Sequence, residues 1–342
     1  MGAAPVALTL PRFLTRRGRQ VEQLVLAWDG QALAYVQARQ DTDDRYRVQR
    51  FGVLRPEGGK PGDELARQLT TLGLRGKTAR AMLRPAQYQM LQIDAPAVPP
   101  EELRKAARWQ IREMVNMHVD DLTLDVLKVG DDKVRASGSV FVVAAANAVI
   151  RDLMQTAQAA RCDVEVIDIQ DLAQRNLQSA LARRTGGAER AHAAIVMVDD
   201  SQALLTICAN EELFYTRRID LGTGFMQAAW GQTPAAANGE ADLALTPPGQ
   251  EADPAQRLVV ETQRSLDLWD RTWPMLALDR IGVQAGSRTA ELAALLAREL
   301  GQAVTALDVS AQFPGFEGGS EADRLLCWPL LGVLLRIEGR KL

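Results

Sequence analysis

The stretch 192–219, HAAIVMVDDSQALLTICANEELFYTRRI, decides the fold because an earlier part of the chain repeats its plan. It holds three strand-like runs, and the turn Asp199-Asp200-Ser201 separates the first two. The earlier stretch, 23–38, reads QLVLAWDGQALAYVQA and has two such runs about the turn Asp29-Gly30-Gln31; residues 45–54 supply a third. Two similar halves predict a fold built on an internal repeat.

Each strand triplet leads into alternating helices and strands, the pattern of an α/β fold. After the first triplet, the apolar spacing predicts helices at 63–72, 147–160 and 170–182, with strands at 79–83 and 164–167. After the second, it predicts helices near 225–230 and at 254–271, 289–300 and 322–337, with strands at 279–283 and 303–307. Residues 231–253, rich in Pro, Ala, Gly and acids, are expected to form a flexible loop.

A compact insert interrupts the first half at about 86–145. A strand at 88–93 ends at a proline-rich break, and a helix begins at Pro100 and runs to about 115. A hairpin of 122–129 and 134–144 completes the insert. Trp109 lies off the apolar stripe of the helix. That stripe comprises Leu103, Ala107, Gln110, Ile111 and Met114.

The composition excludes several classes of protein. Apolar residues make up 47% of the 342 residues, and 40 Lys and Arg against 43 Asp and Glu give a net charge of −3. No basic excess indicates nucleic-acid binding. Three cysteines without a C-x-x-C spacing indicate neither a disulfide framework nor a zinc site. With no apolar run of about 18 residues and no signal peptide, we expect a cytoplasmic protein.

The N-terminal tail, residues 1–20, is basic and has two interpretations. It carries four arginines among apolar residues. The first interpretation is a frayed, solvated tail. The second is a weak contact with an anionic membrane surface, worth about 1 kcal/mol per basic residue.

Common catalytic motifs do not fit. Gly76-Lys77-Thr78 lacks the earlier glycine of a phosphate-binding loop, and Gly222-Thr223-Gly224 lacks the third glycine of a dinucleotide fingerprint. His118 and His192 are far in sequence from the cysteines, and no catalytic residue is assigned. The pair Asp199-Asp200 suits either a metal-bound phosphate or a solvated turn.

Several segments together resemble the actin-like type IV pilus assembly proteins of the PilM type, and more closely the MSHA pilus biogenesis proteins (MshI). The resemblance covers about residues 21–337. The most telling segment is QIDAPAVPPEEL at 92–103, followed by ARWQ at 107–110. Further segments are VVAA at 142–145, VIDI at 166–169, AQRNL at 173–177, FYTRRI at 214–219, ETQRSLD at 261–267, WDR at 269–271 and PLLGVLLR at 329–336.

The resemblance implies a two-lobed actin-like fold, related to ribonuclease H, with a small extra subdomain in the first lobe. The first lobe would span 21–85 and 146–188, the insert 86–145, and the second lobe 189–342. The loop 231–253 stands where the family has an outer subdomain, which we expect to be reduced.

The resemblance also implies a partner. It would be the N-terminal cytoplasmic tail of a bitopic inner-membrane pilus protein, and the complex would connect the membrane platform to the cytoplasmic pilus motor. The chain would then be cytoplasmic and peripheral to the inner membrane. In the family this tail lies between the insert and the first lobe. The corresponding candidates for partner binding are Leu83, Tyr88, Met90, Trp109 and Arg112.

The nucleotide site departs from the family pattern of two turns with Asp-x-Gly-Ser/Thr. The first turn, Asp29-Gly30-Gln31, has its glycine shifted and lacks the hydroxyl; the second, Asp199-Asp200-Ser201, lacks the glycine and adds a negative charge. A like charge at ~4 Å costs on the order of 1–4 kcal/mol. The nucleobase side keeps only Gly286-Ser287. These eight residues are the candidates for a degenerate nucleotide site, and we expect neither ATP hydrolysis nor a metal or other cofactor.

Two alternatives stay open beside this non-catalytic scaffold. The first is a functional ATP-binding switch or ATPase, in which Asp29 and Asp199 would position Mg²⁺. The second is the cytoplasmic domain of a type II secretion platform protein. Such domains continue into a membrane helix, which does not follow Leu342 in this sequence.

Overall fold

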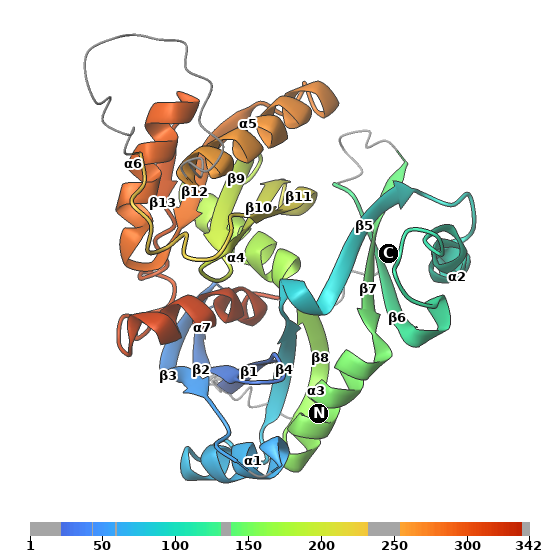
Figure 1. Cartoon of the computed structure of the whole chain (residues 1–342), viewed down its shortest axis with the longest axis vertical. Coiled ribbons are helices and arrows are strands. Elements are labelled where there is room, and N and C mark those ends of the chain that lie inside the picture. The colour runs from blue at the N-terminus through green and yellow to red at the C-terminus, as the bar shows by residue number, and fades with distance from the viewer. Residues whose placement is uncertain (1–21, 43, 59, 131–137, 232–253, 337–342) are drawn as a thin grey trace, which may run out of the picture.

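The computed structural model describes residues 22–42, 44–58, 60–130, 138–231 and 254–336. The basic tail 1–20 and nearly all of the expected loop 231–253 lie outside the described residues. Two five-stranded sheets and one three-stranded sheet form the framework (Figure 1). No described helix combines the length and the apolar character that a membrane crossing requires.

The two larger sheets have the same plan. The first has the order β3-β2-β1-β4-β8, in which β1 to β3 form an antiparallel meander and β4 and β8 are parallel to β1. The second has the order β11-β10-β9-β12-β13 with the same directions. The internal repeat predicted from the sequence is therefore confirmed. The strands of the first sheet are Glu22–Trp28, Leu33–Thr42, Arg45–Leu54, Thr78–Leu83 and Asp163–Ile169, and those of the second are Ala191–Met197, Gln202–Ala209, Glu212–Asp220, Leu278–Gln284 and Val304–Ala306.

Helices cover the outer faces of these sheets and fill the space between them (Figure 1). α1 (Pro61–Thr71) and α3 (Asn147–Ala159) pack together beside the first sheet, and α5 (Pro254–Thr272) and α6 (Thr289–Leu300) lie beside the second. We call each sheet with its outer helices a lobe. α4 (Gln170–Arg184) and α7 (Glu321–Leu334) pack against each other between the two lobes.

The last helix belongs to the second half in sequence but packs against the first lobe. Its residues Cys327, Leu330 and Leu331 are buried in one apolar cluster with β1 and β2. The segment before α7 also crosses over, since the N–H groups of Tyr46 and Val48 on the edge strand β3 donate to the carbonyls of Gln312 and Pro314, both at 2.9 Å. The two lobes therefore share a C-terminal segment, which ties them together.

The insert forms a third unit beside both lobes (Figure 1). Its sheet has the order β5-β7-β6, from Tyr88–Asp94, Ser139–Ala146 and Leu122–Lys128. α2 (Pro100–Gln110) packs on one face through Ala107 and the adjacent Ile111. The expected extension of this helix to 115 is wrong. The N–H groups of Arg112 and Met114 bond three residues back, so the chain leaves the helix and Met114 is exposed.

Short turns complete the description. Three single-turn helices comprise Pro85–Gln87, Val119–Asp121 and Gly286–Arg288. The helix expected near 225–230 is a run of turns. There, the indole N–H of Trp230 donates to the carbonyl of Phe225 at 2.9 Å, and both rings are buried.

Candidate functional site

The first predicted turn follows the carboxyl end of β1. The Asp29 carboxylate accepts hydrogen bonds from the N–H groups of Gln31 and Ala32, at 2.9 and 2.8 Å. Gly30 has a φ of +93°, a region that favours glycine. The shifted glycine thus supports a turn whose N–H groups point at its own carboxylate.

The second turn follows β9, at the equivalent place in the second lobe. Asp199 accepts from the N–H groups of Ser201 and Gln202, at 2.8 and 2.9 Å, and from the Ser201 hydroxyl at 2.8 Å. The main-chain carbonyl of Asp200 accepts from the N–H of Phe225 at 3.0 Å. In each turn, two main-chain N–H groups therefore bond to the aspartate of the same turn.

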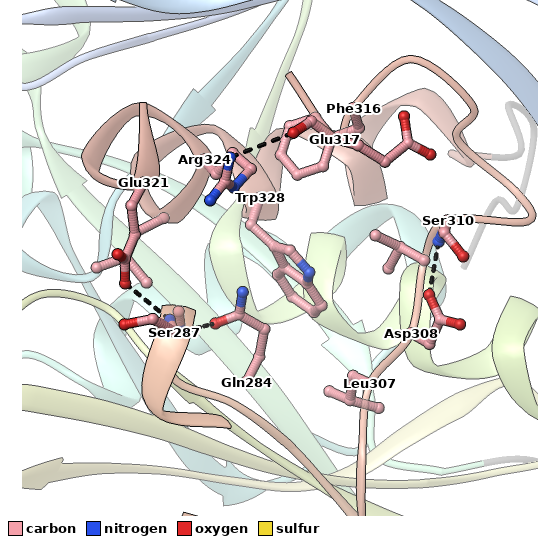
Figure 2. Close-up of a pocket in the computed structure, with 13 residues that line it drawn as sticks. Gln284, Ser287, Leu307, Asp308, Ser310, Phe316, Glu317, Glu321, Arg324 and Trp328 are labelled. Carbon is pink, nitrogen blue, oxygen red and sulfur yellow. Dashed lines mark hydrogen bonds between the residues drawn. The ribbon is translucent and has the colours of Figure 1, made fainter. Parts of the chain in front are cut away.

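The third predicted element, Gly286-Ser287, follows β12 and lies against the start of α7. The N–H of Ser287 donates to the Glu321 carboxylate at 2.7 Å, and this contact lowers the pKa of Glu321. Both residues line a pocket of about 250 Å³, shown in Figure 2. Trp328, Phe316 and Leu307 provide its apolar walls. The pocket lies where the second sheet meets the helix that packs on the first.

Arg84 is a residue of this region that the sequence interpretation missed. It directly follows β4 and is only 9% exposed. Its Nη2 donates to the carbonyl of Leu326 in α7 at 3.1 Å. Burial lowers the pKa of Arg84, and the carboxylates of Asp29 and Asp199 oppose this shift. Its signal in the sequence was an arginine at the end of a mostly apolar strand, followed by Pro85.

The structure separates the five candidates for partner binding into two groups. Leu83 and Tyr88 are buried, and Met90 is partly buried among the cores of both lobes. Trp109 is 65% exposed and Arg112 is exposed, both at the end of α2. The other tryptophans of the described chain are buried. An open surface at the insert therefore includes Trp109 and Arg112 but neither Leu83 nor Tyr88.

Two more exposed apolar side chains follow α2 in the sequence. Met114 and Met117 are about half exposed in the turns after α2. Among the described residues, no three His, Cys, Asp or Glu side chains are grouped so that they could hold a metal ion.

Comparison with known proteins gives consistent matches. The family model described as type IV pilus assembly protein PilM matches residues 62–314. The structure of a PilM-PilN type IV pilus biogenesis complex is similar with a TM-score of 0.65 and 16% identity, over 93% of this chain and 100% of that one. This likeness shows a shared fold, and the expected two-lobed actin-like fold is confirmed.

Two further solved structures match less closely. One is a Bacteroides thetaiotaomicron protein with an actin-like ATPase fold, with a TM-score of 0.47 and 8% identity over 89% of this chain and 95% of that one. The other is the cytoplasmic domain of EpsL from the type II secretion system of Vibrio cholerae, with a TM-score of 0.43 and 14% identity over 72% and 95%. No curated protein sequence matches the chain.

Proposed function

The chain belongs to the family of type IV pilus assembly proteins PilM, and on that premise we propose that it is a non-catalytic adaptor of pilus biogenesis. Its task is to hold a partner at the membrane platform rather than to turn over nucleotide. The observation that carries this proposal is that main-chain N–H groups in the turns after β1, β9 and β12 already bond to carboxylates of the same chain.

These turns do not suit a magnesium nucleotide. Phosphate groups need free N–H donors. The N–H groups of five residues instead bond to Asp29, Asp199 or Glu321 of the same chain. Those residues are Gln31, Ala32, Ser201, Gln202 and Ser287. A phosphate would displace these carboxylates and meet their negative charge. This argument supports an adaptor without ATP hydrolysis.

The partner that we infer is the N-terminal cytoplasmic tail of a bitopic inner-membrane pilus protein. A short tail needs a small surface with an anchoring side chain, and exposed tryptophans are frequent anchors. Trp109 provides such an anchor, and the exposed Arg112 follows it, with its main-chain N–H bonded to the carbonyl of Trp109. The proposal places the contact at the insert, which packs against both lobes.

The finer assignments belong to the same proposal. We infer an MSHA-type system and an MshI-like role, on the residues of the insert that resemble those proteins. The protein would be cytoplasmic and bound to the inner membrane through its partner, with the pilus motor as a second contact. A membrane contact of the basic tail 1–20 concerns residues outside those that the structure describes.

A calorimetric titration tests the partner. The probe is a synthetic peptide with the tail sequence of the bitopic pilus protein from the same organism. We expect Trp109→Ala to weaken binding at least tenfold, because anchoring aromatic residues contribute about 2 kcal/mol or more. Leu268→Ala is the matched control, since Leu268 is a half-exposed apolar residue on α5 of the other lobe. Equal affinities of all three proteins would refute the proposed surface.

One observation favours an ATP-binding switch as the second candidate. The pocket of about 250 Å³ beside Gly286 and Ser287 has aromatic and polar walls at the carboxyl ends of β12 and β13. Titration of the full chain with Mg-ATP separates the two functions. Binding well below millimolar concentration would favour the switch, and absence of heat and of a thermal shift would favour the adaptor.

A further inference from the structure

The pocket of Figure 2 combines aromatic walls with exposed acids. The walls include the buried rings of Trp328 and Phe316. Three exposed carboxylates line the same pocket, two from the connection between β13 and α7 and one from the first residue of α7. They belong to Asp308, Glu317 and Glu321. Aromatic rings beside carboxylates are suited to an organic cation, and a guanidinium can both stack on a ring and bond to a carboxylate.

The lining contains one basic residue, Arg324, which already bonds within the chain. Its Nη1 donates to the main-chain carbonyls of Glu317 and Gly319, at 3.2 and 3.1 Å. In the described part of the chain, none of the three carboxylates forms an ion pair. Three acids against one arginine leave the pocket negatively charged, so it disfavours a phosphate and favours a cation.

Two side-chain donors at this pocket have no partner among its lining residues. Trp328 is only 3% exposed, and its indole N–H donates to none of the other residues in Figure 2. Gln284 accepts from the N–H of Gly286 through Oε1, at 3.0 Å, whereas its Nε2 donates to none of them. A buried donor without a partner is costly, so a ligand with acceptor atoms would be stabilised here.

A basic peptide meets both requirements. Its main-chain carbonyls accept from an indole and from an amide, and an arginine side chain adds the cation. A nucleotide provides acceptors, but its phosphates add charge of the wrong sign. A simple amine provides the charge but no acceptor. The chemistry of the pocket therefore favours a peptide that contains arginine.

We propose that this pocket docks a basic peptide segment and that its occupant is the basic tail of the same chain, residues 1–20. The tail leads into β1, whose Val25 and Ala27 share an apolar cluster with Trp328 of the pocket. A segment of this length reaches at most about 70 Å, and covalent attachment gives it an effective concentration of about millimolar. It contains no acidic residue and four arginines, which are Arg12, Arg16, Arg17 and Arg19.

This inference goes beyond the adaptor role, because it assigns a ligand to the pocket beside α7 and holds for any partner of the insert. A simpler account is that the acids only fix local turns. Asp308 accepts from the N–H of Ser310 at 2.9 Å, and Glu321 accepts from that of Ser287 at 2.7 Å. The amide oxygen of asparagine or glutamine can keep these bonds. Asp308→Asn with Glu321→Gln therefore removes charge from the pocket and preserves the turns.

The test measures binding of a labelled peptide to full-length proteins by fluorescence anisotropy. The peptide has the sequence of residues 1–20. A tail variant of the full chain carries Arg12→Gln, Arg16→Gln, Arg17→Gln and Arg19→Gln, which leaves its pocket open to the peptide. We expect this variant to bind the peptide at least tenfold more tightly than the wild type, in which the attached tail competes.

A second pair of variants locates the binding site. Adding Asp308→Asn and Glu321→Gln to the tail variant should weaken peptide binding about tenfold or more, because charge-assisted bonds to the arginines are lost. Asp270→Asn with Glu299→Gln is the matched control. It removes the same charge from exposed positions on α5 and α6, and we expect it to leave the affinity unchanged.

The proposal is overturned if the tail variant binds no peptide at millimolar concentration, or if the pocket pair and the control pair have the same affinity. Equal binding by the wild type and the tail variant, with the pocket dependence kept, would identify a basic segment of another protein as the occupant and overturn the assignment to the tail. Neither measurement uses the pilus-protein peptide, so failure here and failure of the adaptor proposal are distinguishable.

Discussion

Tyr88 of the insert donates its phenolic hydrogen to the carboxylate of Asp171, the second residue of α4. Asp171 also accepts from the Thr216 hydroxyl of the second lobe at 2.5 Å. Arg218 donates to the carbonyl of Tyr88 at 3.0 Å and lies over its ring. One buried carboxylate therefore joins the insert, the central helix and the second lobe.

Tyr88→Phe should lower the free energy of unfolding by about 1–3 kcal/mol, because it leaves the buried Asp171 with one partner fewer. Urea unfolding measures the effect. Tyr215→Phe is the control, since that hydroxyl lies 3.3 Å from the neutral hydroxyl of Ser265 in a partly buried place. Equal losses of unfolding free energy in the two variants would mean that the bond to Asp171 stabilises the fold no more than an ordinary hydroxyl contact.

The contact between α4 and the second sheet predicts a second effect. The Gln174 amide donates to the carbonyls of Ala194 and Leu204 and to the Thr206 hydroxyl, at 2.9 to 3.1 Å, and is buried. Gln174→Met keeps the length of the side chain but removes these bonds. We expect a loss of about 1–3 kcal/mol in urea unfolding.

The exposed Gln158 of α3 provides the matched substitution for this measurement. Gln158→Met should change the stability by less than about 0.5 kcal/mol. If Gln174→Met were as stable as Gln158→Met, packing alone would hold α4 to the second sheet.

The repeated strand plan was predictable because apolar alternation and turn residues are local signals. The hairpins around Asp29 and Asp199 show this. The end of α6 was predictable for the same reason, since Gly301 follows its last residue and adopts a left-handed conformation. Strand period and glycine preference are set by the residues themselves.

Other features depend on contacts between distant segments, which no local pattern records. Arg84 lies in the region of the candidate site only because β4 pairs with β1 and because α7, which follows the second lobe in sequence, crosses to contact it. Tyr88 is a residue type that often anchors a partner at a surface. In the structure it is buried, and its hydroxyl donates to Asp171, which lies 83 residues away in the sequence. The apolar spacing of α2 continued to Met114, but Arg108 bonds to the returning chain at Val119 and Leu122 while the helix ends at Gln110.

A pH-dependent contribution is expected from Glu321. Its bond to the N–H of Ser287 lowers its pKa below the usual 4.5. A carboxyl whose pKa is lower in the folded state stabilises the fold above the unfolded pKa, and this contribution is lost as the pH falls through the folded one.

Glu321→Gln should therefore make the stability less dependent on pH below about 4.5, with little difference in that slope near pH 7. Thermal unfolding of both proteins from pH 7 to pH 3 measures it. Parallel stability curves for the two proteins over this pH range would contradict a lowered pKa of Glu321 in the folded state.

The closest approach of the two central helices predicts the largest effect. A Cβ at Gly332 of α7 would lie 1.9 Å from the carbonyl oxygen of Ala173 in α4, which is main chain and cannot rotate away. Gly332→Ala must push α4 and α7 apart. Both helices lie between the two lobes, so the change should weaken the contact between the lobes. We expect a loss of about 3 kcal/mol or more, at the upper end of overpacking effects.

Gly318→Ala separates this clash from the general effect of replacing glycine, because a Cβ there meets no atom within 4 Å and the position does not require a left-handed conformation. Denaturant unfolding of both variants, with soluble yield as the readout if Gly332→Ala does not fold, gives the comparison. Gly318→Ala should be neutral or slightly stabilising, since alanine restricts the unfolded chain. A Gly332→Ala protein as stable as the wild type would show that α4 and α7 can separate at little cost, and the shared helices would not hold the lobes.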